Sequence, residues 1–253
     1  MNKKIIQDLN NLNTKFYQAV ADSFSDSRNS AWQGWEKLIP QLSSLFISHK
    51  SPKVLDLGCG NARFAEFLIQ KFPKLKINYF GLDSNADLLK IAEEKLINHN
   101  SCIRSQFQQV DLVSELLNDN FKNRLKSENY DLVVAFGLMH HLPSFEIRVK
   151  LLKLLADLLP KNSYLIIAFW QFHKSERLMR KVVNPGLVKI NKKELEKNDF
   201  ILDWQRGKTA HRYCHSFTDE EIEKLVEESG LQLASSFNAD GKENLNRYAV
   251  LRK

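Results

Sequence analysis

The chain alternates between short runs of closely spaced apolar residues and longer segments in which apolar residues recur every three or four positions. The short runs are residues 53–57, 76–83, 106–112, 130–137 and 163–169. Their length and aliphatic content are typical of buried parallel strands. The longer segments are residues 62–72, 85–98 and 144–158. Their spacing indicates amphipathic helices, so the alternation predicts a parallel sheet with helices on both faces.

The C-terminal part departs from this simple alternation. A helical pattern at 218–229 is followed by strand-like runs at 232–237 and 245–251, which the turn Asn-Ala-Asp-Gly at 238–241 joins. Such a hairpin would place an antiparallel strand at the end of the sheet. The predicted fold is therefore α/β and Rossmann-like, a doubly wound, mostly parallel seven-stranded sheet with an antiparallel C-terminal strand.

Composition fits one intracellular domain. A chain of 253 residues can bury a large core, so we expect a single domain with an N-terminal helical cap over residues 1–50. Cys59, Cys102 and Cys214 are widely scattered, which argues against a disulfide framework and favours a reducing compartment. The apolar runs are strand-sized, so we predict a cytoplasmic protein with no membrane partner.

The segment after the first strand has the character of a cofactor loop. Gly58 and Gly60 let the backbone turn sharply and approach a ligand, and Asn61 could cap a helix that begins near Ala62. About twenty residues later the second strand ends at Asp83, where a carboxylate can accept hydrogen bonds from both ribose hydroxyls of an adenosine. These features leave two classes open, a NAD-type dehydrogenase and a methyltransferase.

The spacing of the glycines separates these classes. The loop differs from the dinucleotide fingerprint GxGxxG and resembles the GxGxG loop of class I S-adenosylmethionine methyltransferases, with Ala62 in place of the last glycine. That resemblance implies S-adenosylmethionine as cofactor, with Asp56 near its ammonium group and Asp111 and the amide of Leu112 at its adenine. The predicted cofactor-binding residues are Tyr17, Arg28, Asp56, Gly58, Cys59, Gly60, Asn61, Asp83, Ser84, Asp111, Leu112 and Phe136.

A more specific resemblance covers nearly the whole chain from Tyr17. Residues 17–32, YQAVADSFSDSRNSAW, together with the cofactor loop, resemble the catalytic domain of eukaryotic tRNA wobble-uridine methyltransferases that esterify 5-carboxymethyluridine. Residues 139–143, MHHLP, resemble that family's doubled histidine, and residues 211–217, HRYCHSF, are similar to its RYYH block. The resemblance implies tRNA as partner, and some family members also work with a small activating protein.

The implied chemistry asks for positioning groups. A carboxymethyl carboxylate has a pKa of about 4 and is already anionic at neutral pH, so no general base is needed. Arginine suits such a substrate because its planar fork matches a carboxylate. The predicted catalytic residues, all in positioning roles, are Arg28, His141, Arg212 and His215. The family pattern also offers Arg28 for the carboxylate of S-adenosylmethionine, so its role stays divided.

The distribution of charge predicts a basic surface beside the active site. The formal net charge is +7, and residues 172–198 carry eight Lys and Arg against three Glu. An insertion at about 171–210, after the fifth strand, would overhang the active-site face and suggests an acidic substrate such as nucleic acid. A solvated lysine-rich surface would have the same composition. The predicted substrate-binding residues are Trp204, Tyr213, Lys181, Lys192 and Lys193.

Other interpretations remain open. The spacing of His173, His211, Cys214 and His215 is compatible with zinc ligands, but no CxxC pair accompanies them and the RYxH resemblance accounts for the same segment. We therefore predict no metal. A small-molecule carboxyl or hydroxyl methyltransferase and a noncatalytic partner with this fold are the alternatives, and the intact carboxylates of the cofactor loop favour an enzyme.

Overall fold

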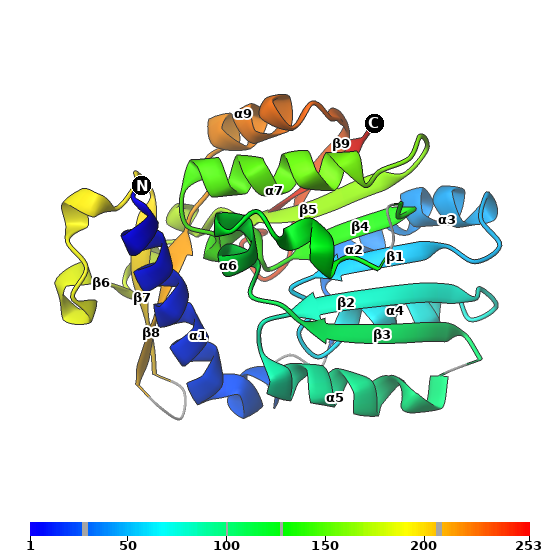
Figure 1. The fold of residues 1–253 in the computed structure, drawn as a ribbon, viewed down its shortest axis with the longest axis horizontal. Helices are drawn as coiled ribbons and strands as arrows, with labels where there is room; N and C mark the ends of the chain where they lie inside the picture. The colour runs from blue at the N-terminus through cyan, green and yellow to red at the C-terminus, as the bar shows by residue number, and fades with distance from the viewer. Residues whose placement is uncertain (27–29, 100, 127–128, 206–208) are drawn as a thin grey trace.

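The computed structural model describes residues 1–26, 30–99, 101–126, 129–205 and 209–253. A seven-stranded sheet in the order β3-β2-β1-β4-β5-β10-β9 forms the centre of the molecule (Figure 1). Its strands are β1 Lys53–Leu57, β2 Ile77–Asp83, β3 Ile103–Gln109, β4 Leu132–Phe136, β5 Tyr164–Trp170, β9 Gln232–Ala239 and β10 Asn246–Arg252. Strands β1 to β5 are parallel, and β10 runs antiparallel to both β5 and β9, which confirms the predicted fold class.

Helices cover both faces of this sheet. One layer contains α2 Gln33–Lys37, α3 Ile39–Ile47, α4 Arg63–Lys71 and α5 Ala86–Leu96. The other contains α6 Leu112–Leu117, α7 Phe145–Asp157 and α9 Asp219–Ser229. The short 3-10 helices are η1 Ile97–His99, η2 Phe121–Arg124, η3 Met139–His141, η4 Phe172–Lys174, η5 Pro185–Val188 and η6 Lys192–Glu194. None of the described helices is long and apolar enough to cross a membrane.

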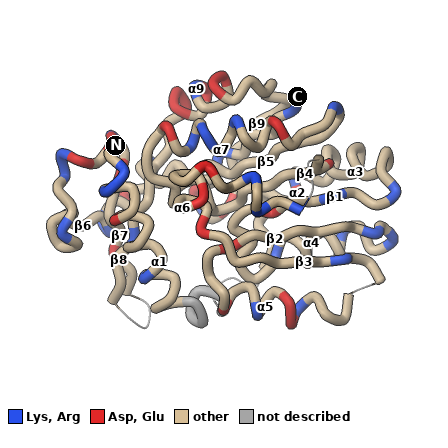
Figure 2. The backbone as a smooth tube through the Cα atoms, viewed as in Figure 1, with Lys and Arg blue, Asp and Glu red and all other residues tan. Residues whose placement is uncertain are grey.

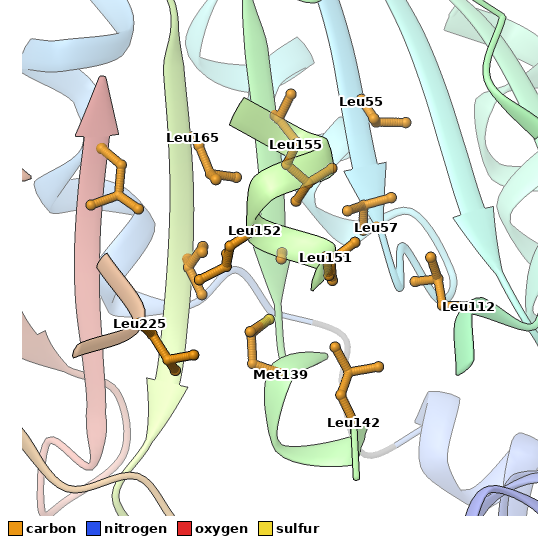
Figure 3. Packing of buried hydrophobic residues seen from close by; sticks show 14 of the residues in the cluster. Leu55, Leu57, Leu112, Met139, Leu142, Leu151, Leu152, Leu155, Leu165 and Leu225 are labelled. Atoms are coloured by element: carbon orange, nitrogen blue, oxygen red, sulfur yellow. The ribbon is translucent and has the colours of Figure 1, made fainter. Parts of the chain in front are cut away.

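The core follows from the alternation of side chains along the strands. In β4, Val133 and Ala135 pack under α7, whereas Leu132 and Val134 pack on the opposite face. Figure 3 shows the α7 side, where Leu151, Leu152 and Leu155 lie against leucines of β1 and β5. Both faces of the central strands are therefore apolar, as the unbroken hydrophobic runs indicated.

The third strand begins and ends earlier than predicted. β3 spans Ile103–Gln109, whereas the sequence pattern placed it at 106–112. The side chain of Asp111 accepts a hydrogen bond from the backbone N–H of Ser114 and caps α6. A cap residue of this kind starts a helix, so the chain leaves the strand before it reaches Asp111.

Helix α1, Lys3–Asp26, crosses the molecule at the carboxyl ends of the parallel strands (Figure 1). Ile5 and Leu9 are buried and pack with Ile190, Ile201 and Tyr213 of the segment that follows β5. The helix thus lies between the edge of the central sheet and this inserted segment. The predicted N-terminal helical segment is present as α1, α2 and α3.

The inserted segment contains a second, three-stranded antiparallel sheet that the sequence analysis did not predict. It consists of β6 Val182–Val183, β7 Asp199–Trp204 and β8 Ala210–His215, preceded by α8 Glu176–Met179. Pairing of β7 with β8 places Asp199 opposite His215 and Leu202 opposite Arg212. The block that resembled RYYH is therefore a strand, and its side chains alternate between two faces.

Buried charges attach this second sheet to the helices of the main domain. The guanidinium of Arg148 in α7 is 1% exposed, and its Nη2 lies 2.8 Å from Glu196 Oε2 and 3.1 Å from Glu221 Oε1. Glu196, from the inserted segment, also accepts hydrogen bonds from the N–H of Phe145 at the start of α7. A carboxylate at a helix N-terminus is favourable because the unpaired N–H groups and the helix dipole attract it.

His215 completes this network from β8. Its Nδ1 lies 2.7 Å from Asp199 Oδ1 and its Nε2 lies 2.7 Å from Glu221 Oε2. Burial lowers the pKa of this imidazole, but the two carboxylates outweigh it and raise the pKa overall. We call Arg148, Glu196, Asp199, His215 and Glu221 the buried ion network.

Replacement of the central cation tests the importance of this network. Arg148→Met should lower the free energy of unfolding by about 3 kcal/mol, because two carboxylates would lose their guanidinium in a partly buried site. Urea unfolding measures the loss. Lys122→Met is the matched control, since Lys122 pairs with Asp157 on the exposed surface and should cost far less. Equal losses in the two variants would contradict the assignment.

Candidate active site

A cleft opens at the carboxyl ends of β1, β2 and β4, and α1 forms one of its walls. All of the predicted cofactor-binding residues line it except Arg28, which lies outside the described residues. They are Tyr17, Asp56, Gly58, Cys59, Gly60, Asn61, Asp83, Ser84, Asp111, Leu112 and Phe136. In open α/β sheets ligands bind at this edge, at the point where the strand order reverses. Here that point lies between β1 and β4, because β2 and β3 follow β1 on one side and β4 and β5 lie on the other.

The glycine loop has the conformation that its residues permit. Gly58 and Gly60 have φ angles of 69° and 54°, in the left-handed region that favours glycine. The N–H groups of Gly58 and Cys59 donate to the carbonyl of Leu82, at 2.7 and 3.1 Å. A Cβ on Gly58 would lie 3.2 Å from the Cβ of Leu138, so the glycine loop packs closely against Leu138.

The irregular position of the loop is strained. Ala62 is fully buried and has a φ of 59°. This left-handed conformation costs about 1 kcal/mol or slightly more for a residue with a Cβ. Helix α4 begins at Arg63, and Ala62 occupies the position before it with no side-chain cap. The prediction that Asn61 caps this helix is therefore wrong, because the cap position falls one residue later.

Asp83 is held at the tip of β2 by the backbone. Its Oδ2 accepts a hydrogen bond from the N–H of Gly60, and its Oδ1 accepts one from the N–H of Asn85, both at 2.9 Å. Burial raises the pKa of this carboxyl, and the N–H donors oppose the rise. An ionised carboxylate has about four acceptor positions, so capacity remains for the hydroxyls of a ligand.

Asp56 lies deeper in the cleft and titrates near neutrality. Its side chain is 3% exposed and accepts a hydrogen bond from the hydroxyl of Tyr79. Burial raises the pKa of Asp56 to about 7, although Tyr79 and the charge of Arg63 lower it in part. A ligand cation beside Asp56 would restore its charged form.

Asp111 already has several protein partners. It accepts from the N–H and hydroxyl of Ser114 at 3.1 and 2.8 Å, and from Asn10 Nδ2 at 2.7 Å. Asp111 therefore fixes both α6 and α1 at the wall of the cleft. An adenine contact, as the sequence predicted, would add to these bonds.

Helix α1 supplies a wall that the sequence analysis missed except for Tyr17. Asn10, Asn13, Thr14 and Tyr17 line the cleft at helical spacing i, i+3, i+4 and i+7. This polar stripe is visible in the sequence as a recurrence at helical spacing, but a solvated helix face would have the same pattern, so the sequence alone does not assign it to a cleft. Other lining residues that were missed are Trp32, Trp35, Arg63, Phe64, Leu88, Val110, Val113, Gly137, Leu138 and Leu142.

His141 joins α1 to β8 at the edge of the cleft. Its Nε2 lies 2.7 Å from the hydroxyl of Tyr17, and its Nδ1 lies 3.3 Å from both Asn13 Nδ2 and the carbonyl oxygen of Tyr213. The ring is therefore oriented by neutral groups. It lies in η3 and lines the cleft, and its positioning role stays a prediction.

Arg212 sits behind Tyr17 and is 8% exposed. Its guanidinium carbon lies 5.3 Å from the ring centre of Phe16, 5.6 Å from that of Trp170 and 5.8 Å from that of Trp204. Within the described part of the chain no carboxylate forms an ion pair with it, and the hydroxyl of Tyr17 is its hydrogen-bonding neighbour. Trp204, predicted to stack on a base, packs edge-on against Phe16 and walls in this cation.

Two residues predicted for the acceptor pocket lie elsewhere. Tyr213 is fully buried and its hydroxyl donates to Asp199 Oδ1 at 2.7 Å, so it has no free ring face for a base. His215 has both ring nitrogens on carboxylates of the buried ion network. Neither lines the cleft, and this placement corrects the expectation for both residues.

The basic residues of the insertion lie on its outer surface. Lys181, Lys192 and Lys193 are exposed, and none of them pairs with an acid among the residues that the structure describes. Figure 2 shows basic positions along the insertion beyond α1. They do not line the cleft, so their contact with substrate stays a prediction.

The set of zinc ligands considered from the sequence does not assemble. His211 lies 3.9 Å from Asp203, and His173 Nδ1 lies 2.8 Å from the hydroxyl of Ser216. Over the described ranges, two other groups bring three donor atoms together. They are His140 with His141 and Cys214, and Glu196 with Asp199 and His215. The second group belongs to the buried ion network, and in the first, burial raises the pKa of Cys214 to about 11 and disfavours a thiolate.

The chain matches a known protein family in sequence and solved structures in fold. Residues 28–236 match a family model described as a methyltransferase domain. A solved S-adenosylmethionine-dependent methyltransferase from Methanosarcina mazei shares the fold, with a TM-score of 0.62 at 16% identity over 85% of this chain and 97% of that one.

Curated relatives include tRNA and small-molecule enzymes. The probable tRNA methyltransferase 9B of Bos taurus is 21% identical over 79% of this chain and 34% of its own length. The tRNA (carboxymethyluridine(34)-5-O)-methyltransferase ALKBH8 of Mus musculus is 27% identical over 67% of this chain and 22% of its own. The malonyl-[acyl-carrier protein] O-methyltransferase of Priestia megaterium is 27% identical over 67% and 53%. The chain thus spans about a third of the length of the tRNA methyltransferase 9B proteins.

The pKa of Asp56 predicts how cofactor binding depends on pH. A carboxyl with a pKa of about 7 is protonated below pH 7 and then cannot pair with a ligand ammonium, so affinity for S-adenosylhomocysteine should fall by up to about tenfold per pH unit below 7. Calorimetric titration between pH 5.5 and 7.5 measures this profile. Asp56→Asn should bind weakly with a flat profile, and the exposed Asp157→Asn should match the native protein. A slope retained in Asp56→Asn would assign the titration to another group.

The residues present fit an adenosine-bearing amino acid cofactor. Asp83 offers acceptors for ribose, Asp56 a carboxylate for an ammonium, and the left-handed glycines a close backbone approach. The sheet order, the position of the cleft and the family match over most of the chain agree with this assignment. The chain belongs to the family of S-adenosylmethionine-dependent methyltransferase domains.

Proposed function

We propose that this chain transfers the methyl group of S-adenosylmethionine to a carboxylate on a modified wobble uridine of tRNA, which forms a methyl ester. The observation that carries the proposal is Arg212. It is a buried guanidinium that contacts Tyr17 of the cleft wall without lining the cleft itself, is enclosed by aromatic rings, and forms no ion pair with a carboxylate among the described residues. Such a cation needs an anion, and an acceptor carboxylate would supply it.

The physical argument rests on the cost of burying charge. A buried cation without an ionic partner loses its hydration, and cation–π contacts recover only part of that loss. The planar fork of arginine matches the two oxygens of a carboxylate better than any single hydroxyl or amine. Arg212 therefore favours an acidic acceptor over a neutral one.

The chemistry agrees with the neutral surroundings of His141. One carboxylate oxygen forms a bond to the methyl carbon while the carbon–sulfur bond breaks, and the electron pair stays on sulfur. No proton is transferred, so the reaction does not need His141 as a general base. His141 contacts Tyr17 and Asn13, and it instead orients the hydroxyl of Tyr17. Alignment of the reacting groups can contribute about 7–11 kcal/mol.

Two observations favour tRNA as the carrier of the carboxylate. Relatives that are named as tRNA methyltransferases match most of this chain. The exposed lysines of the insertion lie at the same end of the sheet as the cleft, beyond α1 (Figure 2). A basic surface beside an active site can contact phosphates on either side of a bound nucleotide.

A second candidate is a carboxyl methyltransferase that acts on a small acid or on an acid carried by a protein. The relative from Priestia megaterium, a malonyl-[acyl-carrier protein] O-methyltransferase, favours it, at an identity equal to that of ALKBH8. Arg212 serves both candidates because each acceptor is a carboxylate. The two therefore differ in the carrier, which the assays below distinguish.

Substitution of Arg212 tests the acceptor. Arg212→Gln should lower kcat/KM for tRNA that carries carboxymethyluridine by about 100-fold or more, because a charged bidentate contact is lost. Its affinity for S-adenosylhomocysteine should stay within about threefold of the native value, and Arg212→Lys should be intermediate. Transfer of labelled methyl measures the rate, and release of the label by mild alkali identifies an ester.

The control for this substitution is Arg104→Gln, which removes an exposed arginine from β3. It should leave transfer unchanged. Native transfer rates in Arg212→Gln would contradict the proposed carboxylate contact. Transfer to small acids or to an acylated carrier protein, without transfer to tRNA, would support the second candidate.

The surface lysines make a separate prediction for binding. The triple variant Lys181→Gln, Lys192→Gln and Lys193→Gln should bind tRNA more weakly and reduce the slope of log affinity against log salt by up to about 2–3, because each phosphate contact contributes about 0.7–0.9. Filter binding at several salt concentrations measures the slope. A triple variant of Lys50, Lys74 and Lys76, exposed lysines at the opposite end of the strands, is the matched control. Equal slopes in both variants would contradict the proposed tRNA surface.

A further inference from the structure

We propose that the hydroxyl of Tyr17 donates a hydrogen bond to the acceptor carboxylate, and that a change of tautomer at His141 makes this hydroxyl available. The inference rests on the proposed function, because it takes a carboxylate as the methyl acceptor. Tyr17 lines the cleft, whereas Arg212 contacts Tyr17 without lining the cleft itself. Of this pair, Tyr17 is therefore the residue that a ligand in the cleft reaches first.

The Nδ1 atom of His141 lies between two groups that require opposite protonation states of it. It is 3.3 Å from the carbonyl oxygen of Tyr213, which can only accept, and 3.3 Å from Asn13 Nδ2, which can only donate. The backbone N–H of Tyr213 donates to Asn13 Oδ1 at 2.8 Å, and this bond fixes the orientation of the amide. Each neutral tautomer of His141 therefore has a partner at Nδ1.

The two tautomers direct the hydrogen of the Tyr17 hydroxyl differently. Nε2 of His141 lies 2.7 Å from this hydroxyl. When Nδ1 carries the proton, Nε2 is an acceptor and the hydroxyl donates to it. When Nε2 carries the proton, it donates to the hydroxyl oxygen, and Arg212, which is also only a donor, takes the second lone pair. The hydroxyl hydrogen is then left to donate to a ligand in the cleft.

An acceptor carboxylate favours the Nε2–H tautomer because it accepts this hydrogen bond. A hydrogen bond to a charged acceptor is roughly twice as strong as one between neutral groups. One proton leaves Nδ1 for solvent and another is taken up from solvent at Nε2, so the imidazole stays neutral throughout. A neutral acceptor offers a weaker bond and shifts the tautomer less. The arrangement therefore distinguishes acids from neutral molecules of the same shape.

The outer edge of β8 fixes the groups around His141. β8 is the last strand of the inserted sheet, and α1 packs along it (Figure 1). An edge strand has backbone groups that no neighbouring strand pairs. At Tyr213 these groups meet Asn13, which is 6% exposed, and His141. The backbone of β8 thus holds both partners of Nδ1 in place, and His141 and Asn13 act as positioning residues for Tyr17.

Nitrogen-15 NMR of the histidine rings tests the tautomer directly. At pH 8, where an ordinary imidazole is neutral, sodium acetate should move the His141 signals toward the Nε2–H form. Acetamide, a neutral analogue, and sodium chloride at the same concentration should leave them nearly unchanged. The signals are assigned by their loss in His141→Gln.

Tyr17→Phe should abolish the response to acetate. The matched control is Tyr164→Phe, at the amino end of β5 and away from the cleft, which should respond as the native protein does. A native protein that does not respond to acetate, or a response retained in Tyr17→Phe, would overturn the proposal.

Methyl transfer gives a second readout. Tyr17→Phe should lower kcat/KM for tRNA that carries carboxymethyluridine by about 10- to 100-fold, the loss of one hydrogen bond to a charged group. Its affinity for S-adenosylhomocysteine should stay within about threefold of the native value, which also shows that the variant is folded. An equal loss of cofactor affinity would overturn the proposal and assign the hydroxyl to the cofactor.

A double-mutant cycle separates this role from a purely structural one. Asn13→Asp keeps an acceptor for the N–H of Tyr213 but removes the Nδ2 donor, so it should hold His141 in the Nδ1–H form and slow transfer. The double variant with Tyr17→Phe should be no slower than Asn13→Asp alone, because both changes remove the same contact. Losses that multiply would overturn the proposal.

The two measurements distinguish failure of this inference from failure of the proposed function. A tautomer shift with acetate but no transfer to tRNA would support the inference and refute tRNA as the carrier of the carboxylate. Native rates of transfer to tRNA in Tyr17→Phe would overturn the inference and leave the proposed function intact.

Discussion

The position of β8 depends on the imidazole of His215, which is held between the carboxylates of Asp199 and Glu221 at 2.7 Å on each side. This contact attaches the inserted sheet to α9, and Arg148 extends the attachment to α7 through Glu196. Because buried charges tolerate little displacement without a loss of partners, the strand is fixed relative to the main domain. Arg212 lies on that strand, so the buried ion network determines where the proposed acceptor carboxylate is bound.

The two halves of the proposed reaction are thus positioned by different parts of the molecule. The central sheet supplies Asp56 and Asp83 at the ends of adjacent strands, where the cofactor is expected. The inserted sheet supplies Arg212, and α1 lies between them with Tyr17 facing His141. Methyl transfer needs both groups aligned, so a helix that contacts both halves is well placed to set their spacing.

The cofactor side could be predicted from sequence because its determinants are local. A glycine turn after an apolar strand, and carboxylates at strand tips, reach the same edge in any parallel sheet, and the structure places Asp56, Asp83 and Asp111 there. The residues that would bind the methyl acceptor could not be predicted in the same way. The partners of Tyr213 and His215 are fixed by pairing with β7 and by packing on α9, and the RYYH resemblance carries no information on either. Arg212 of that block contacts Tyr17 of the cleft wall but does not itself line the cleft, so its contact with the acceptor stays a prediction.

We propose that the chain esterifies a carboxylate on tRNA. Mass spectrometry of nucleosides from bulk tRNA, with and without the gene, tests it most directly. Loss of the gene should remove a methyl ester of a 5-substituted uridine and leave the corresponding free acid in its place. Unchanged 5-substituted uridines would contradict the claim and direct attention to an acid that is carried by another molecule.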